Sequence, residues 1–265
     1  MAIFGPKVVH KATKLPSQNT MTIVWSPQKG IRKVWHVGQA LNRRVEVACR
    51  SNIGQSPHKR DERLNFKMET ARRLYDNWSP IIRKWAQEPD VEIEFRLGRK
   101  TAHKFDTNVG QEAFQKLLKA LAKYDGWEST SKGTYTVYYG EQNKRITVDE
   151  ATDESVAVIK TKIEALDFAL DDKPFDIRLG VAKEKPYEQD DEEMTSVKTK
   201  KRWSFVRKNL SIDLTQMQGD PEDKDADEDS TWHVEFEVVN PKDLGDRDKL
   251  FALMHKIFDL LNCLD

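Results

Sequence analysis

The stretch that decides the fold reads Val91-Glu92-Ile93-Glu94-Phe95-Arg96-Leu97-Gly98. Charged and apolar residues alternate along it with period two, which predicts a β-strand. Glu92, Glu94 and Arg96 then share one face of the strand. The opposite face is branched aliphatic or aromatic, as expected of a wall that packs against a hydrophobic layer.

A second stretch near the other end of the chain, Trp232-His233-Val234-Glu235-Phe236-Glu237-Val238-Val239, has the same alternation. Glu235 and Glu237 share one face there. Two like charges about 4 Å apart repel by roughly 4 kcal/mol at an effective dielectric near 20, so carboxylates that converge from both strands need a cation. Mg²⁺ and Mn²⁺ prefer oxygen ligands of this kind. The alternative is a pair of amphipathic edge strands with solvated acidic faces.

Basic residues alternate in the same way on four further stretches. They are Lys198, Lys200 and Arg202 in 197–205, Lys160 and Lys162 in 157–163, Arg145 after a turn at 140–143, and Arg178 in 175–179. Any one of these stretches alone is typical of a solvated strand face. Together with the two glutamate strands they predict the lining of a closed barrel, where cations hold a polyanion and carboxylates hold a metal. This combination suits phosphoryl transfer.

The same residues resemble the triphosphate tunnel metalloenzymes, whose signature is Glu-x-Glu-x-basic on the first strand and Glu-x-Glu on the last. Further matches, in the family's motif order, resemble the fungal and protozoan metal-dependent mRNA-capping RNA 5′-triphosphatases. These matches are Ile159-Lys160-Thr161-Lys162-Ile163-Glu164-Ala165-Leu166, Asp176-Ile177-Arg178 followed by Glu184-Lys185-Pro186, Lys200-Lys201-Arg202-Trp203-Ser204-Phe205, and Ile212-Asp213-Leu214-Thr215-Gln216. The resemblance runs from about Val91 to Val239.

The resemblance implies an α+β fold, an antiparallel eight-stranded β-barrel tunnel with helices packed outside. It implies that Glu92, Glu94 and Glu237 ligate Mg²⁺ or Mn²⁺. It implies that Glu235 orients the attacking water and can deprotonate it, and that Glu184 braces a basic neighbour. The residues that it places on the γ-phosphate are Arg145, Lys200 and Arg202. Those that it places elsewhere along the substrate are Lys160, Lys162, Arg178, Lys198 and Arg96.

The chain departs from the family's pattern at three positions. Arg96 stands where the broad signature has Lys, which exchanges a point charge for a planar fork of donors. His233 stands where some relatives carry a third glutamate. Ser211 stands where a relative can carry a basic residue, so we expect that phosphate contact to be missing.

The predicted activity is metal-dependent hydrolysis of the γ-phosphate from the 5′-triphosphate end of nascent mRNA, with Mn²⁺-dependent cleavage of free NTP in vitro. An RNA guanylyltransferase is a candidate partner. One alternative is a tunnel phosphatase for small substrates, such as tripolyphosphate or thiamine triphosphate. Another is a non-catalytic RNA-binding barrel, which the four glutamates disfavour because bare acid repels phosphate.

The chain of 265 residues divides into a basic extension, residues 1–60, and a catalytic domain, residues 61–265. The extension holds eleven Lys or Arg and a single acid, Glu46. We expect it to be partly disordered, either sampling RNA or an acidic partner through sequence-independent electrostatics or serving as a solvating tail.

Three helical segments are predicted from apolar periodicity. The first covers residues 61–87 as two helices broken at Ser79-Pro80, with Leu64, Met68, Leu74 and Trp78 in the core. The others cover residues 108–124 and 244–261 and pack outside the barrel. The strand alternation also predicts that Trp203 points outward, away from the basic face.

Several classes of protein are disfavoured. The chain has only two cysteines, Cys49 and Cys263, and no His-x-x-x-His pair, so neither a disulfide framework nor a zinc site is expected. It also has no Gly-rich phosphate loop of the Walker spacing and no Cys-x5-Arg loop. The two cysteines indicate a reducing compartment, and because no signal peptide or membrane span is evident we expect a soluble intracellular protein. The family resemblance implies a nuclear protein, or a cytoplasmic one if viral.

Overall fold

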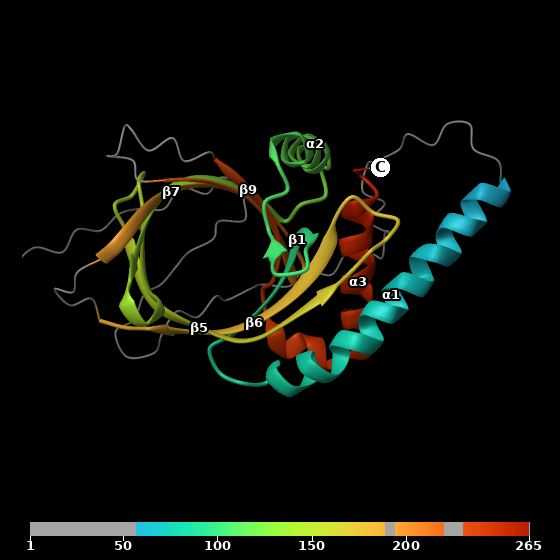
Figure 1. Ribbon diagram of the computed structural model, residues 1–265, viewed down its shortest axis with the longest axis horizontal. Helices are drawn as coiled ribbons and strands as arrows, with labels where there is room; N and C mark the ends of the chain where they lie inside the picture. The colour runs from blue at the N-terminus through green and yellow to red at the C-terminus, as the bar shows by residue number, and fades with distance from the viewer. Residues whose placement is uncertain (1–56, 189–193, 220–229, 265) are drawn as a thin grey trace, which may run out of the picture. The chain divides into compact units, whose positions relative to one another are not determined.

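The structure, a computed structural model, describes residues 57–188, 194–219 and 230–264, all within one compact unit. In these ranges the chain forms a closed barrel of eight antiparallel strands (Figure 1), as predicted. The strands are β1 (Val91–Lys100), β3 (Ser129–Gly140), β4 (Lys144–Asp149), β5 (Ser155–Phe168), β6 (Asp176–Pro186), β7 (Met194–Arg207), β8 (Leu210–Gln218) and β9 (Thr231–Val238). Around the barrel their order is β1-β6-β5-β4-β3-β7-β8-β9.

The barrel closes where the two glutamate strands pair. In the antiparallel register of β1 and β9, Glu94 lies opposite Glu237 and Arg96 opposite Glu235. Directly opposed residues of an antiparallel pair share a face, so these four ionisable side chains all lie on the inner wall. The closure therefore brings together residues that are more than a hundred positions apart in the sequence.

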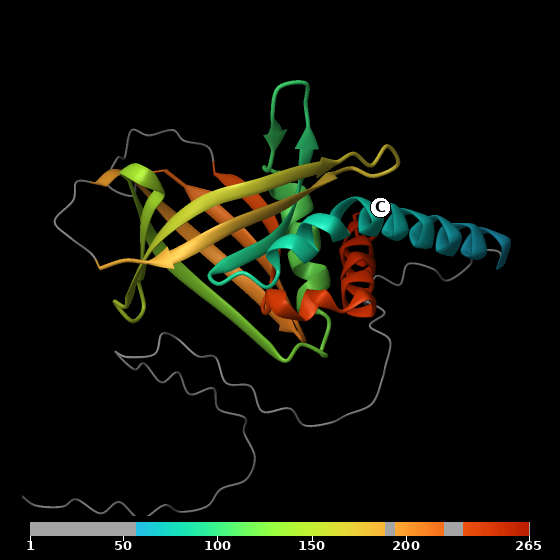
Figure 2. The same ribbon diagram turned by 90° about the horizontal axis from the view of Figure 1, so that it is seen from below.

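Helices cover one side of the barrel. They are α1 (Pro57–Trp85), α2 (Gln111–Ala122) and α3 (Arg247–Leu261), and α3 follows a 3₁₀ turn, η2 (Pro241–Gly245). In Figures 1 and 2, α1 and α3 lie together on the side of the barrel away from β7. The predictions of helices over 108–124 and 244–261 are confirmed, and the helices begin three residues inside the predicted bounds.

The predicted break at Ser79-Pro80 is wrong, since α1 continues through Pro80 as one helix. Trp78 and Ile82, on either side of the proline, are 1% and 0% exposed. Burying two large apolar side chains stabilises the helix by several kcal/mol, which offsets the roughly 3 kcal/mol cost of an internal proline. Pro80 itself is exposed, where water can satisfy the carbonyl left without a partner. Leu74 is buried as predicted, and the side chains of residues 64 and 68 lie outside the described ones.

A hairpin at the end of β1 projects from the barrel. There β1 pairs with the short strand β2 (Phe105–Asp106), and the connection stands clear of the barrel wall in Figure 2. A Cβ at Gly98 would lie 2.3 Å from both the Asp106 carbonyl oxygen and the Phe105 ring. Only glycine allows this close return of the chain.

Partway along β5, the positions that point into the barrel and those that point outward change places. The register of β5 with β6 shifts between Lys162 and Glu164, at a β-bulge. Lys160 and Lys162 precede the shift and keep the inner face, whereas Glu164 points outward and accepts hydrogen bonds from Trp85 Nε1 at 2.7 Å and Lys84 Nζ at 3.0 Å on α1. A bulge of this kind reverses the alternation that the sequence pattern predicts.

Three further predictions concern single residues or the chain ends. Trp203 packs outward against Phe114 of α2, with ring centroids 5.7 Å apart, as predicted. Cys263 is buried and disulfide-bonded, whereas no disulfide framework was expected from the sequence. The predictions for the basic extension fall on residues 1–56, outside the described ones, and on the first turn of α1. No described helix is long and apolar enough to cross a membrane.

Candidate active site

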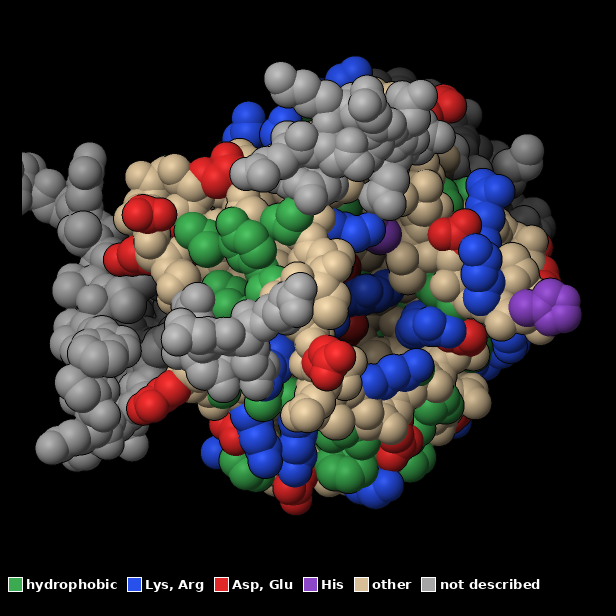
Figure 3. Space-filling model, turned by 60° about the vertical axis from the view of Figure 1, so that its left-hand side comes forward, with side chains coloured by type: hydrophobic (Ala, Val, Ile, Leu, Met, Phe, Trp, Pro, Cys, Tyr) green, Lys and Arg blue, Asp and Glu red, His purple; other side chains and the backbone are tan. Residues whose placement is uncertain are grey.

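The inner wall gathers the residues that the sequence singled out. Glu92, Glu94 and Arg96 come from β1, and their inner-face neighbours come from five other barrel strands. Those neighbours are Glu235 and Glu237 on β9, Lys198, Lys200 and Arg202 on β7, Lys160 and Lys162 on β5, Arg178 and Glu184 on β6, and Arg145 on β4. Figure 3 shows a hollow in the surface with Lys and Arg side chains at its edge.

Arg96 joins the two glutamate strands. Its Nε lies 2.9 Å from Glu94 Oε1 on its own strand, and its Nη2 lies 3.1 Å from Glu235 Oε1 on β9. Burial alone would lower the pKa of Arg96, but Glu235 and Glu94 raise it above its ordinary value. A lysine could not reach both carboxylates with separate donors in a fixed plane, so the departure from the family's Lys has a structural use here.

Lys160 forms the second centre of charge. Its Nζ pairs with Glu92, lies 3.1 Å from Glu184 Oε1 and lies 3.9 Å from Glu94 Oε2. Burial disfavours the charged amine, yet the three carboxylates raise the pKa of Lys160. The contact with Glu184 is the bracing of a basic neighbour that the family resemblance implies.

The glutamates of the lumen have opposite proton affinities. Burial, with the nearby Glu94 carboxylate, raises the pKa of Glu92 to about 7. Burial also acts to raise the pKa of Glu235, but the cations of Arg96, Arg202 and Lys200 outweigh it and lower the pKa to about 2. Glu235 therefore stays a carboxylate at every physiological pH, a strong hydrogen-bond acceptor and a weak base.

Asp213 holds Arg202 in place. Arg202 Nη1 lies 3.3 Å from Asp213 Oδ2, and its Nη2 lies 3.7 Å from Glu235 Oε2. The Asp213 side chain is 4% exposed and accepts a 2.7 Å hydrogen bond from Ser211 Oγ. Asp213 was not among the predicted site residues, although the alternation of Ser211, Asp213 and Thr215 along β8 is a signal that could have placed it on the inner wall.

The remaining cations of the lumen differ in their surroundings. Burial and the neighbouring Arg202 lower the pKa of Lys200 to about 8. Arg145 lies over the Tyr139 ring at 5.5 Å, half-buried. Lys162 has the inner-face register but is exposed. These cations lie on different strands of one wall, where a polyanion in the lumen can contact several at once.

Arg178 is engaged by protein groups. Its Nε and Nη2 donate to Asp167 at 2.6 and 3.1 Å, a bidentate pair, and its guanidinium lies 4.5 Å from the Phe105 ring centroid. We predicted that Arg178 contacts substrate. In the structure it anchors β2 to the barrel wall.

The carboxylate set has the chemistry of a hard-cation site. Glu94 and Glu237 face each other across the β1–β9 register, and Glu92 follows on the same face. Opposite Glu94, a Cβ on Gly180 would approach Glu94 Oε1 to 3.1 Å, so the missing side chain leaves this carboxylate room. Among the described residues no three acidic or histidine side chains are arranged as a formed metal site, because Glu92 and Glu94 turn to Lys160 and Arg96. These carboxylate oxygens are the type of ligand that Mg²⁺ and Mn²⁺ prefer, and they lie on one face of the wall.

His233 shares the inner face with this network. Its Nε2 lies 2.9 Å from Thr231 Oγ1, and burial lowers the pKa of the ring. It is thus a neutral group beside Glu235, where some relatives have a further carboxylate.

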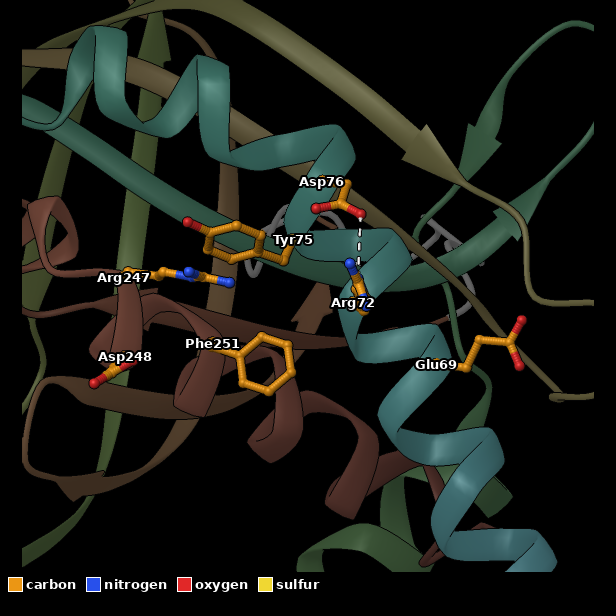
Figure 4. A pocket seen from close by; sticks show the side chains of 7 residues that line it. All are labelled: Glu69, Arg72, Tyr75, Asp76, Arg247, Asp248 and Phe251. Carbon is orange, nitrogen blue, oxygen red and sulfur yellow. Dashed lines mark ion pairs between the residues drawn. The ribbon is translucent and has the colours of Figure 1, made fainter.

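A second hollow of about 580 Å³ lies outside the barrel, between α1 and α3. Figure 4 shows its aromatic floor, Tyr75 and Phe251, with charged side chains of both signs around it. Arg72 lies 3.9 Å from Asp76 there. Its mixed charge contrasts with the cationic lumen and gives no basis for binding a polyanion.

Comparisons with known proteins agree with this geometry. The chain is similar in structure to the Schizosaccharomyces pombe Pct1 RNA triphosphatase, with a TM-score of 0.61, 17% sequence identity and coverage of 71% of this chain and 91% of that one. Pct1 in complex with the Spt5 CTD matches equally, with a TM-score of 0.61 at 17% identity over 71% of this chain and 90% of that one. At this identity the match shows the fold. No curated protein sequence matches the chain.

The sequence itself matches one family model over residues 58–264. This range contains every barrel strand and every site residue described above. The chain therefore belongs to the family of the mRNA capping enzyme β chain, the tunnel-fold mRNA triphosphatases.

Proposed function

We propose that this protein removes the γ-phosphate from 5′-triphosphate RNA in a reaction that depends on a divalent metal, giving the diphosphate end that cap formation requires. The observation that carries the proposal is the lumen itself. Lys200 and Arg202 on β7 interact electrostatically with Glu235. Their positive charges help to lower the pKa of Glu235 to about 2.

The cations bind and orient the substrate. Lys200, Arg202 and Arg145 supply the donors for the γ-phosphate, and Asp213 holds the Arg202 fork in one orientation. In phosphoryl transfer the protein acts mainly by positioning and by stabilising charge on the transferring group, which this arrangement supports.

Glu235 orients the water. Because it remains ionised, it accepts a hydrogen bond from the attacking water and aligns the oxygen with the γ-phosphorus. The water oxygen bonds to the γ-phosphorus as the bond from that phosphorus to the bridging oxygen breaks. The water proton passes to the phosphate product or to solvent, and inorganic phosphate and the diphosphate end leave. With a pKa of about 2, Glu235 is suited to orienting the water more than to removing its proton.

Glu92, Glu94 and Glu237 would hold Mg²⁺ or Mn²⁺, which when bound neutralises the phosphate oxygens and polarises the γ-phosphorus. Lys160 and Arg96 pair with Glu92 and Glu94 in this structure, so a metal on these carboxylates would leave both cations available to contact phosphate oxygens.

The cellular setting is part of the proposal. Membership of a capping family supports a nuclear protein that meets nascent mRNA and works beside an RNA guanylyltransferase. The S. pombe relative has been solved in complex with the Spt5 CTD. This complex supports a partner like the Spt5 CTD for this protein. Hydrolysis of free NTP with Mn²⁺ follows from a lumen that contacts phosphates more than bases.

The second candidate is a phosphatase for small substrates such as tripolyphosphate or thiamine triphosphate, since the same lumen binds any triphosphate. Release of phosphate from γ-labelled RNA, compared with release from tripolyphosphate at equal concentration and with Mn²⁺ present, tests the choice. A higher kcat/KM for RNA supports capping. Turnover of tripolyphosphate with none for RNA would reject it.

A further inference from the structure

The hairpin formed by β1 and β2 carries cations that no described acidic side chain pairs within 4 Å. Lys100 and Lys104 are exposed, as are the turn residues Ala102 and His103 between them. Two acids lie beside the hairpin, and both accept hydrogen bonds from backbone N–H groups. Asp176 accepts from Lys100 and Leu170 at 2.8 and 2.9 Å, and Asp106 accepts from Asn108 at 3.0 Å. The lysine side chains of the hairpin are therefore exposed to solvent without an acidic partner among the described residues.

The hairpin is held at the mouth of the barrel by rigid contacts. Phe105 is buried against the Arg178 guanidinium, which Asp167 fixes with two hydrogen bonds. The turn is closed by Thr101, whose N–H donates to the Lys104 carbonyl and whose hydroxyl does the same, both at 2.8 Å. A cationic loop that is held in one orientation loses less entropy on binding than a free tail.

The lumen wall continues directly onto the hairpin. Arg96 and Lys100 have the same strand parity, so Lys100 lies on the face that carries Glu94 and Arg96, beyond the rim. Four residues of strand separate them, about 13 Å at roughly 3.3 Å per residue. In Figure 3, Lys and Arg side chains continue from the edge of the hollow along the surface beside it.

We propose that Lys100 and Lys104 bind phosphates of the RNA chain that follow the triphosphate end, and that this contact makes the enzyme prefer RNA to free nucleotides. The proposal rests on the proposed function of the lumen and specifies how the chain beyond the first nucleotide is held. A free NTP or tripolyphosphate has no phosphate beyond the triphosphate that would lie among Lys200, Arg202 and Glu235, so it lacks the group that the hairpin lysines would contact.

The test uses the full chain with Lys100→Ser and Lys104→Ser together. Both substitutions keep the backbone contacts of the turn and remove two charges. A charge-matched control carries Lys119→Ser and Lys123→Ser, two exposed lysines at the end of α2. Binding of a 5′-triphosphate RNA of roughly ten nucleotides is followed by fluorescence anisotropy over a range of salt, and hydrolysis of RNA and GTP is measured in parallel.

For the hairpin variant we expect RNA affinity to fall about tenfold at low salt, and the slope of log K against log salt to shrink by about 1.4, or 0.7 per lost phosphate contact. The KM for GTP and both kcat values should match the parent. The α2 control should bind RNA as the parent does.

Parental RNA affinity and salt slope in the hairpin variant would overturn the proposal, as would an equal loss in the α2 control. A parental protein that binds the RNA but releases no phosphate from it would reject the proposed function instead, and the binding arm would still decide the role of the hairpin.

Discussion

The two faces of β1 show how one strand divides stability from chemistry. The inner face carries Glu92, Glu94 and Arg96, and the outer face carries Ile93, Phe95 and Leu97, each 0% exposed. The outer face packs against Trp78 of α1, with the Phe95 ring centroid 5.3 Å away. The side chains of the inner face are joined by ion pairs and hydrogen bonds among charged groups. A barrel can keep charges inside only if another surface supplies the free energy to hold its shape, and here the helices supply it.

Removal of the metal should have the largest effect and acts on the inner face alone. We expect phosphate release from triphosphate RNA to stop on exhaustive chelation and to return with Mn²⁺ or Mg²⁺, because the proposed mechanism has Glu92, Glu94 and Glu237 hold that cation. A steady-state assay before and after dialysis against chelator measures this. Undiminished turnover in the chelated protein would end the metal mechanism.

Glu235→Gln should lower kcat about 10²–10⁴-fold, roughly 3–5 kcal/mol of barrier, because the amide keeps the size of the side chain and loses the charge that orients water. Its Mn²⁺ titration should stay close to that of the parent. Glu237→Gln is the matched control on the same face and should require more Mn²⁺ for half-maximal rate. If both variants hydrolyse and titrate like the parent, the glutamates are a solvated face and the site lies elsewhere.

Phe95→Ala probes the outer face. Removing a fully buried ring should lower the free energy of unfolding by about 3–5 kcal/mol, measured by urea denaturation. Below the transition, kcat per folded molecule should stay near the parental value, because no side chain of the lumen changes. A variant with parental stability and impaired kcat would show that the division between the two faces is wrong.

The smallest effect expected is a pH dependence from Lys200. Its pKa is lowered to about 8, so the amine is charged below that pH and neutral above it. We expect KM for the triphosphate to rise several-fold as the pH increases from 7 to about 9, while kcat changes less. Lys200→Arg should flatten the dependence of KM on pH, because the guanidinium stays protonated over this range. A KM that rises equally in both proteins would assign the titration to another group.

Local sequence pattern was enough for the barrel strands and for placing most of the singled-out residues on the inner face. Period-two alternation assigned the inner face correctly on β1, β7 and β9, because strand geometry has no other way to place such residues. Local patterns missed two other features, the bulge on β5 and the continuity of α1. On β5 the bulge after Lys162 turns Glu164 outward to Trp85, and at Ser79-Pro80 the buried Trp78 and Ile82 keep α1 continuous.

The sequence by itself determined which residues share the same face of each strand. The order of its motifs led to the family. Only the tertiary structure decided the partners inside the lumen. Each of these ion pairs joins residues from different strands: Asp213 with Arg202, Lys160 with Glu92 and Glu184, and Asp167 with Arg178. Charge pairing across a barrel depends on register and shear, which are set by the closure of β1 on β9 and not by any local pattern.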